Sequence, residues 1–144
     1  MNWFVRRSER AQALVEFALV IPIFLFVVLG LFDMGRAVFY YNTVSNASRE
    51  AVRLGIVDQN TADIRQQAVD SASGIMPIAV GDVTVQYLAP DLGTTGPCVA
   101  APHEIGCIVR VEVTHTFQPV TPFVGVLTFS AETHQPIERR FASP

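Results

Sequence analysis

The feature that most constrains this chain is an apolar run of 20 residues near its amino terminus, ALVEFALVIPIFLFVVLGLF, from Ala13 to Phe32. A helix rises about 1.5 Å per residue, so the run is about 30 Å long and can cross the hydrocarbon core of a bilayer. Pro22 lacks a backbone donor and is expected to kink the helix, which membrane helices tolerate. We therefore predict a transmembrane helix over residues 12–33.

Glu16 is the one ionisable residue in this apolar run. A charged group inside a membrane helix costs roughly 2.5–3.5 kcal/mol on insertion scales, and such groups are normally paired. The position of Glu16, close to the start of the run, therefore predicts a positively charged partner.

A short basic leader, residues 1–11, precedes the run, and its three arginines, Arg6, Arg7 and Arg10, outweigh Glu9. By the positive-inside rule the leader stays in the cytoplasm and the chain beyond the run is exported. A cleaved secretory signal is the alternative, but the run is too long for one and no small-residue cleavage site ends it. We expect a single-pass protein of the cell membrane with a cytoplasmic amino terminus and an extracytoplasmic carboxy-terminal domain.

The helical pattern continues past the membrane edge as an amphipathic segment, residues 34–57. Asp33 and Arg36 mark the interface, and the aromatic residues 39–41 form a belt there. Small and apolar side chains then recur at helical spacing on one face. This stripe consists of Tyr40, Val44, Ala47, Ala51 and Leu54. Anchor and amphipathic segment are predicted to form one long helix whose stripe packs against another element.

Residues 58–144 are predicted to form a small exported α+β domain. Asn60 or Thr61 caps a second helix, which Gly74 ends. Alternating apolar residues indicate half-buried strands further on. These strands cover residues 83–87, 107–116 and 126–134. The expected fold is α+β, with the long amino-terminal helix packed against a small antiparallel sheet.

Two cysteines, Cys98 and Cys107, lie in a long loop and at the start of the second strand. Downstream of a membrane anchor, such a pair is typical of one disulfide in an oxidising compartment; two free thiols are the alternative. A structural zinc site needs four ligands, and only His103 lies near.

The search for reaction chemistry finds no catalytic motif. The sequence contains neither a glycine-rich phosphate loop nor a nucleophile elbow, and its three histidines are scattered. His115 continues the core face of the second strand, where it is expected to pack. The formal net charge of −3 offers no footprint for nucleic acid. We expect no enzymatic activity, metal, cofactor, nucleic acid or small-molecule substrate.

The membrane entrance carries the most specific pattern, in which arginines and Ala11 are followed by QALVEF. It resembles the amino terminus of type IV prepilins, which have a basic leader, a small residue before the cut, and glutamate as the fifth residue after it. Cleavage after Ala11 makes Gln12 the first residue and Glu16 the fifth; the family usually has glycine where Ala11 stands. The similarity is closer still to TadE-like proteins, pseudopilins or minor pilins of tight-adherence (Tad, Flp) pili. It runs from Arg10 to about Gly55, and VTPFVGVLTFSAETHQPIERR is similar to the family's carboxy-terminal strand.

The resemblance implies a pilin-like fold and a structural role in Tad-type pilus assembly, in adhesion or secretion. The expected partners are the membrane, other pilins or pseudopilins, a prepilin peptidase and the pilus assembly platform. Cleavage would give Gln12 a free α-amine with a pKa of about 8, able to pair with Glu16 inside an assembly.

Three other interpretations stay open. In an uncut anchor, Arg10 is the local partner of Glu16. The chain can also be a membrane-anchored extracytoplasmic binding module that never enters a fibre, or an anchored accessory enzyme. Removal of the leader separates a pilin-like subunit from a plain anchored module.

Overall fold

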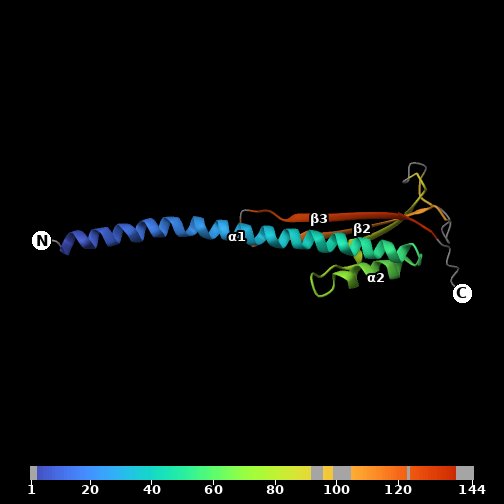
Figure 1. Cartoon of the computed structure of the whole chain (residues 1–144), viewed down its shortest axis with the longest axis horizontal. Coiled ribbons are helices and arrows are strands. Elements are labelled where there is room, and N and C mark those ends of the chain that lie inside the picture. The colour runs from blue at the N-terminus through green and yellow to red at the C-terminus, as the bar shows by residue number, and fades with distance from the viewer. Residues whose placement is uncertain (1–2, 92–95, 99–104, 123, 139–144) are drawn as a thin grey trace.

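The computed structural model consists of one long helix and a small head that is folded on the second half of this helix (Figure 1). The structure describes residues 3–91, 96–98, 105–122 and 124–138, with the side chains of residue 11 and beyond. The head consists of a shorter helix and a three-stranded antiparallel sheet. The predicted α+β fold, with a long amino-terminal helix packed on a small antiparallel sheet, is confirmed.

The long helix, α1, runs from Trp3 to Gly55 without interruption, 53 residues in all. At 1.5 Å per residue it is about 80 Å long. The backbone stays helical through Pro22, and also through the predicted boundaries after residues 11 and 33. Beyond Gly55 the amides of residues 56 and 57 close a turn on the carbonyls of residues 52 and 54. Helical structure thus ends two residues before the predicted boundary at 57.

The sheet has β2 (Ile108–Phe117) at its centre, flanked by β1 (Val83–Leu88) and β3 (Leu127–Pro136). Both pairings are antiparallel, and Val111 lies opposite Val85 on one side and Thr133 on the other. A short 3₁₀ turn, η1 (Val80–Asp82), leads into β1. The three predicted strands are therefore present.

The core lies between the inner face of the sheet and the predicted stripe of α1. Val44, Ala47 and Ala51 are fully buried, and Tyr40 and Leu54 pack at the two ends of the stripe. From the sheet side the core receives alternate residues of β2, which are also fully buried. These are Val109, Val111 and Val113. Helical spacing on one element and strand alternation on the other produce this interface, as the sequence predicts.

The second helix, α2 (Thr61–Ala72), packs against α1 and β1. The side chain of Asn60 accepts a hydrogen bond from the amide of Ala62 at 3.1 Å, so Asn60 is the cap. The predicted buried edge of α2 is fully buried, and consists of Ile64, Ala68 and Ala72. The chain then passes through Gly74 at a φ of +81°, a conformation that glycine adopts without strain.

Candidate membrane-anchoring and assembly site

The first half of α1 extends beyond the head and is covered by no other element (Figure 1). Within the described residues, α1 is the one helix long and apolar enough to cross a membrane. Its large side chains are highly exposed, 68% for Leu19 and 70% for Leu31. An exposed apolar surface of this size marks contact with a membrane or a partner protein. These properties support membrane anchoring through α1.

Glu16 lies exposed on this apolar surface, one helical turn after Gln12. The side-chain amide of Gln12 donates a hydrogen bond to Glu16 Oε1 at 3.2 Å. The carboxylate therefore has one neutral partner on its own helix and remains accessible to a neighbouring chain. Cleavage after Ala11 and pairing of Glu16 with an α-amine stay predictions. The side chain of Arg10, the alternative partner, lies outside the described residues.

Where the apolar run ends, a buried carboxylate joins α1 to the head. Asp33 is only 6% exposed and accepts three hydrogen bonds from the loop between β2 and β3. The donors are Val120 N at 3.0 Å, Thr121 N at 2.7 Å and Thr121 Oγ1 at 2.6 Å. A buried carboxylate needs such partners, because its lost hydration is otherwise not replaced. We name this set of contacts the Asp33 clasp.

Arg36 connects the Asp33 clasp to a cluster of aromatic rings. Its Nη1 lies 3.5 Å from Asp33 Oδ1, and its guanidinium carbon lies 5.7 Å from the ring centroid of Tyr40 and 5.2 Å from that of Phe117. Tyr40 also meets the rings of His115 and Phe117 edge to face. Tyr40 of the predicted interfacial belt therefore packs in the head, and the half-exposed Tyr41 also meets a ring of the head, Phe129, edge to face. His115 packs at the edge of the core, as expected.

Sequence reasoning placed Asp33 at the membrane edge but gave it no partner in the head. The contacting residues are 87 and 88 positions apart, and no periodic pattern encodes such a pairing. The sequence offered two weak signals for this contact: Asp33 lies three residues before Arg36, and a Val-Thr pair lies between two prolines far along the chain.

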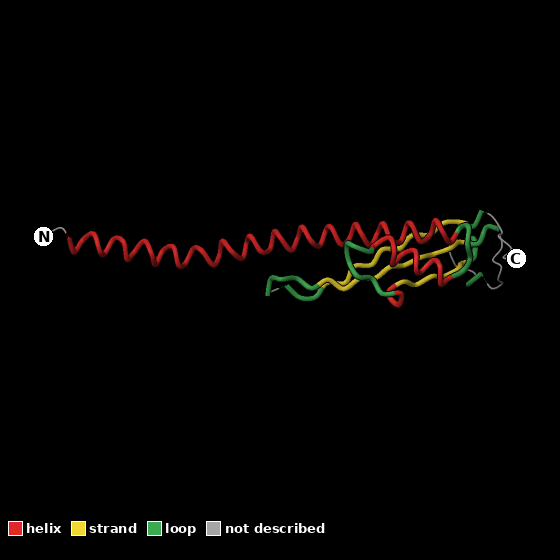
Figure 2. The backbone as a smooth tube through the Cα atoms, turned by 90° about the horizontal axis from the view of Figure 1, so that it is seen from below, coloured by secondary structure: helices red, strands yellow, loops and turns green. Residues whose placement is uncertain are grey.

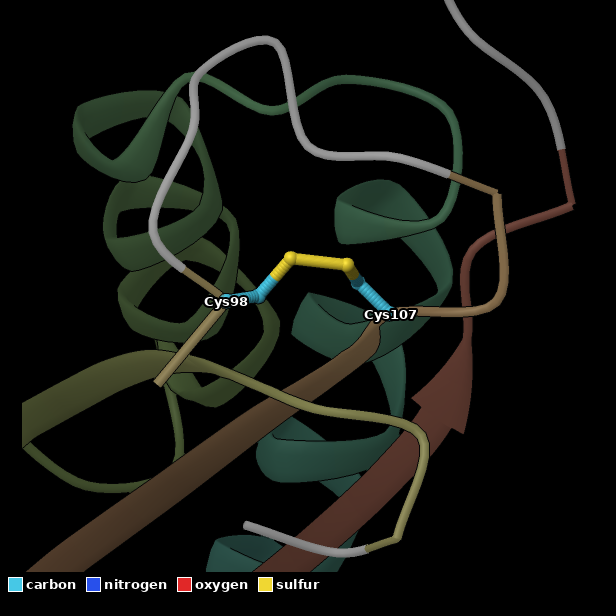
Figure 3. Close-up of a disulfide and its surroundings, with 2 residues drawn as sticks. All are labelled: Cys98 and Cys107. Carbon is cyan, nitrogen blue, oxygen red and sulfur yellow. A yellow bond between two sulfur atoms is a disulfide. The ribbon is translucent and has the colours of Figure 1, made fainter. Parts of the chain in front are cut away.

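Cys98 and Cys107 form a disulfide (Figure 3) at the start of β2, the end of that strand away from the β2–β3 loop. Their Cα atoms are 6.2 Å apart, and Cys107 is buried on the core side, as its position before β2 predicts. The amide of Cys98 also donates to the carbonyl of Tyr87 at 3.0 Å. The disulfide thus connects the segment after β1 to the start of β2.

The remaining chemistry-bearing residues do not converge. His134 is exposed on β3, opposite Arg110 of β2, and His103 lies outside the described residues. In the part of the chain that the structure describes, no group of three or more His, Cys, Asp or Glu side chains is placed to hold a metal ion.

Comparison with known proteins gives one match, to the family of TadE-like proteins over residues 11–53. No curated protein and no solved structure matches the chain. The family match supports an association with Tad pili in general, and the apolar helix supports a membrane-anchored protein. The matched residues cover the exposed half of α1, the Asp33 position and most of the buried stripe. Residues 11–53 are therefore similar to TadE-like proteins, which confirms the resemblance predicted from the sequence.

Proposed function

We propose that this chain is a minor pilin or pseudopilin, a structural component of Tad-type pilus assembly at the cell envelope that serves adhesion or secretion. The observation that carries the proposal is the exposed apolar half of α1, with one accessible carboxylate at its start and a folded head on its continuation. The TadE-like match over the same residues supports it.

Assembly in this proposal proceeds by packing of membrane helices. A prepilin peptidase removes residues 1–11, and Gln12 becomes the new amino terminus. Its free α-amine pairs with the carboxylate of Glu16 on a neighbouring subunit. Away from water the two charges neutralise one another, so the pair selects one axial register between subunits.

The surface of α1 suits close contact between helices. A Cβ atom built at Gly30 would meet nothing within 4 Å, so the backbone there is open to an approaching chain. Small residues let membrane helices approach each other closely, and packing rather than hydrophobicity then drives their association. Other pilins or pseudopilins of the same system are the expected neighbours, since their helices enter the same membrane.

The basic leader and the disulfide agree with the proposed orientation. Positive charge before the membrane segment favours a cytoplasmic amino terminus. The Cys98–Cys107 disulfide suits an oxidising compartment on the other side of the membrane. The head would then face outward, where adhesion or secretion takes place.

Amino-terminal sequencing tests the proposal directly. The full chain is expressed with and without a prepilin peptidase, extracted from membranes and sequenced. We expect a start at Gln12 only when the peptidase is present. Ala11→Gly should be cut at least as well, because glycine is the usual residue of the resembled family, and Ala11→Leu should block the cut. A chain that keeps Met1 in peptidase-containing cells would falsify the pilin proposal and favour the anchored binding module.

A further inference from the structure

The loop between β2 and β3 reaches the end of the apolar run on α1. Figure 2 shows the β2–β3 hairpin projecting along α1 toward its amino terminus, beyond the rest of the head. The Asp33 clasp holds Val120 and Thr121 of this loop directly against α1. Asp33 follows Phe32, the last residue of the apolar run, in the sequence. The tip of the hairpin therefore lies at the level where α1 is predicted to leave the membrane.

The tip is apolar, exposed and uncharged. Four of its large side chains stand in solvent in the isolated chain: Val120 at 56%, Val124 at 46%, Val126 at 61% and Leu127 at 42% exposure. Between Glu112 and Glu132 the sequence contains no acidic residue, lysine or arginine. Four exposed apolar side chains gathered in one loop, with no charged residue among them, mark a contact surface.

The backbone of the tip is also prepared for surroundings without water. Pro119 and Pro122 have no amide hydrogen. The two residues between them, Val120 and Thr121, give their amides to Asp33. Every backbone N–H from residue 119 to 122 is thus either absent or bonded inside the protein. Such satisfaction is what a loop needs where lipid replaces water, because an unbonded amide is costly there.

We propose that the tip of the β2–β3 hairpin, residues 118–122 and 124–127, is a second membrane contact that inserts into the interfacial layer of the bilayer that α1 crosses. The proposal rests on the membrane-spanning role of α1. It favours lipid over a protein partner because the apolar surface of the tip continues the exposed surface of α1 at the same level. There Leu31, Phe32 and Met34 are 61–70% exposed. The Asp33 clasp sets the depth of the tip by tying it to the end of the span.

Tryptophan fluorescence in vesicles tests this contact. Trp3 is the sole tryptophan, so Trp3→Phe provides a dark background in the full chain. Val124→Trp places a probe at the tip. Val57→Trp is the matched control, since Val57 is 45% exposed against 46% for Val124 and lies about 36 Å further along the helix direction from Asp33. Each protein is reconstituted into phosphatidylcholine and phosphatidylglycerol vesicles, with and without lipids brominated on their acyl chains.

We expect blue-shifted emission and several-fold stronger bromine quenching for Val124→Trp than for Val57→Trp. Val126→Trp supplies a second probe position at the tip if Val124→Trp does not fold. Equal quenching of tip and control would overturn the proposal. A blue shift without bromine quenching, growing with the protein-to-lipid ratio, would also overturn it, because it would place the tip against a second copy of the chain.

A third probe separates this proposal from the membrane span on which it rests. Phe24→Trp lies inside the apolar run and must be quenched by brominated lipid if α1 crosses the bilayer. If Phe24→Trp is quenched and both tip probes are not, the span stands and the tip contact is wrong. If Phe24→Trp is not quenched, the span itself fails and the tip contact fails with it.

Discussion

Gly55→Ala tests how tightly α1 is packed against the head. A Cβ atom at Gly55 would lie 2.9 Å from Val109 Cγ2 and 3.3 Å from Ile64 Cδ1, well inside normal carbon–carbon contact. Val109 is β-branched and fully buried, so its side chain is stiff and its neighbours resist its displacement. Overpacking of this kind costs about 1–3 kcal/mol, whereas replacing a helical glycine by alanine returns about 0.5–1 kcal/mol. We expect Gly55→Ala to lower the free energy of unfolding by about 1–2 kcal/mol.

The assay is pulse proteolysis of the head across a urea series, with the full chain held in lipid nanodiscs. With a urea m-value of about 1–3 kcal/mol/M, this loss lowers the midpoint by about 0.3–2 M. Gly35→Ala is the matched control, because a Cβ atom at Gly35 meets nothing within 4 Å and should not lower the midpoint. In a Val109→Ala background, Gly55→Ala should cost much less, because only the contact with Ile64 Cδ1 at 3.3 Å remains tight. A Gly55→Ala midpoint at or above that of wild type would refute the packing argument.

Three further predictions address assembly, the core and alkaline stability. Glu16→Ala should leave the chain in the membrane but abolish its co-purification with other pilus components; normal co-purification would exclude the pairing role of Glu16. Ser48 Oγ donates to the Val111 carbonyl at 3.1 Å and lies 2.8 Å from Thr133 Oγ1. Ser48→Ala should therefore lower the free energy of unfolding of the head by about 1–2 kcal/mol, measured by pulse proteolysis. Ser130→Ala is the control and should change the stability little, because Ser130 is exposed. Burial and, to a lesser degree, the nearby Asp58 carboxylate raise the pKa of Tyr87 to about 12. The neutral phenol therefore stabilises the fold fully below pH 10, and this contribution is lost as the pH rises from 10 to 12. Tyr87→Phe should make the urea midpoint fall less steeply between pH 10 and pH 12.

The parts of the fold that repeat with a fixed period could be predicted from the sequence. Ala47 and Ala51 lie one helical turn apart, and Val109 and Val111 lie two residues apart on a strand, so each set shares one face whatever it packs against. An apolar face left in water costs free energy, so each helix and strand was expected to bury its apolar face on another element. The head was predictable because its core is made of such faces.

Contacts between single polar residues were not predictable in this way. Ser48 is fully buried beside the predicted stripe, and its partners in β2 and β3 are 63 and 85 residues away. Asp33 was interpreted as a marker of the membrane interface because the apolar run precedes it in the sequence and an amphipathic helical segment follows it. Arg36 on the same helix supplies one donor to Asp33, and the other three come from the β2–β3 loop, whose return to α1 depends on strand length and register.

The continuity of α1 makes its two halves act as one body. Asp33 lies 17 residues after Glu16, about 25 Å along the helix, and Ala51 lies about 27 Å further. The head packs on the second half of α1 and is also held to it at Asp33. In the proposed assembly, an axial register selected at Glu16 would therefore also fix the height of the head above the membrane. A flexible linker at residue 33 would break this relation, since the pairing of the membrane helices would then say nothing about the head. In the proposed assembly, the uninterrupted helix and the Asp33 clasp would therefore let the pairing of Glu16 order the folded head as well as the membrane helices.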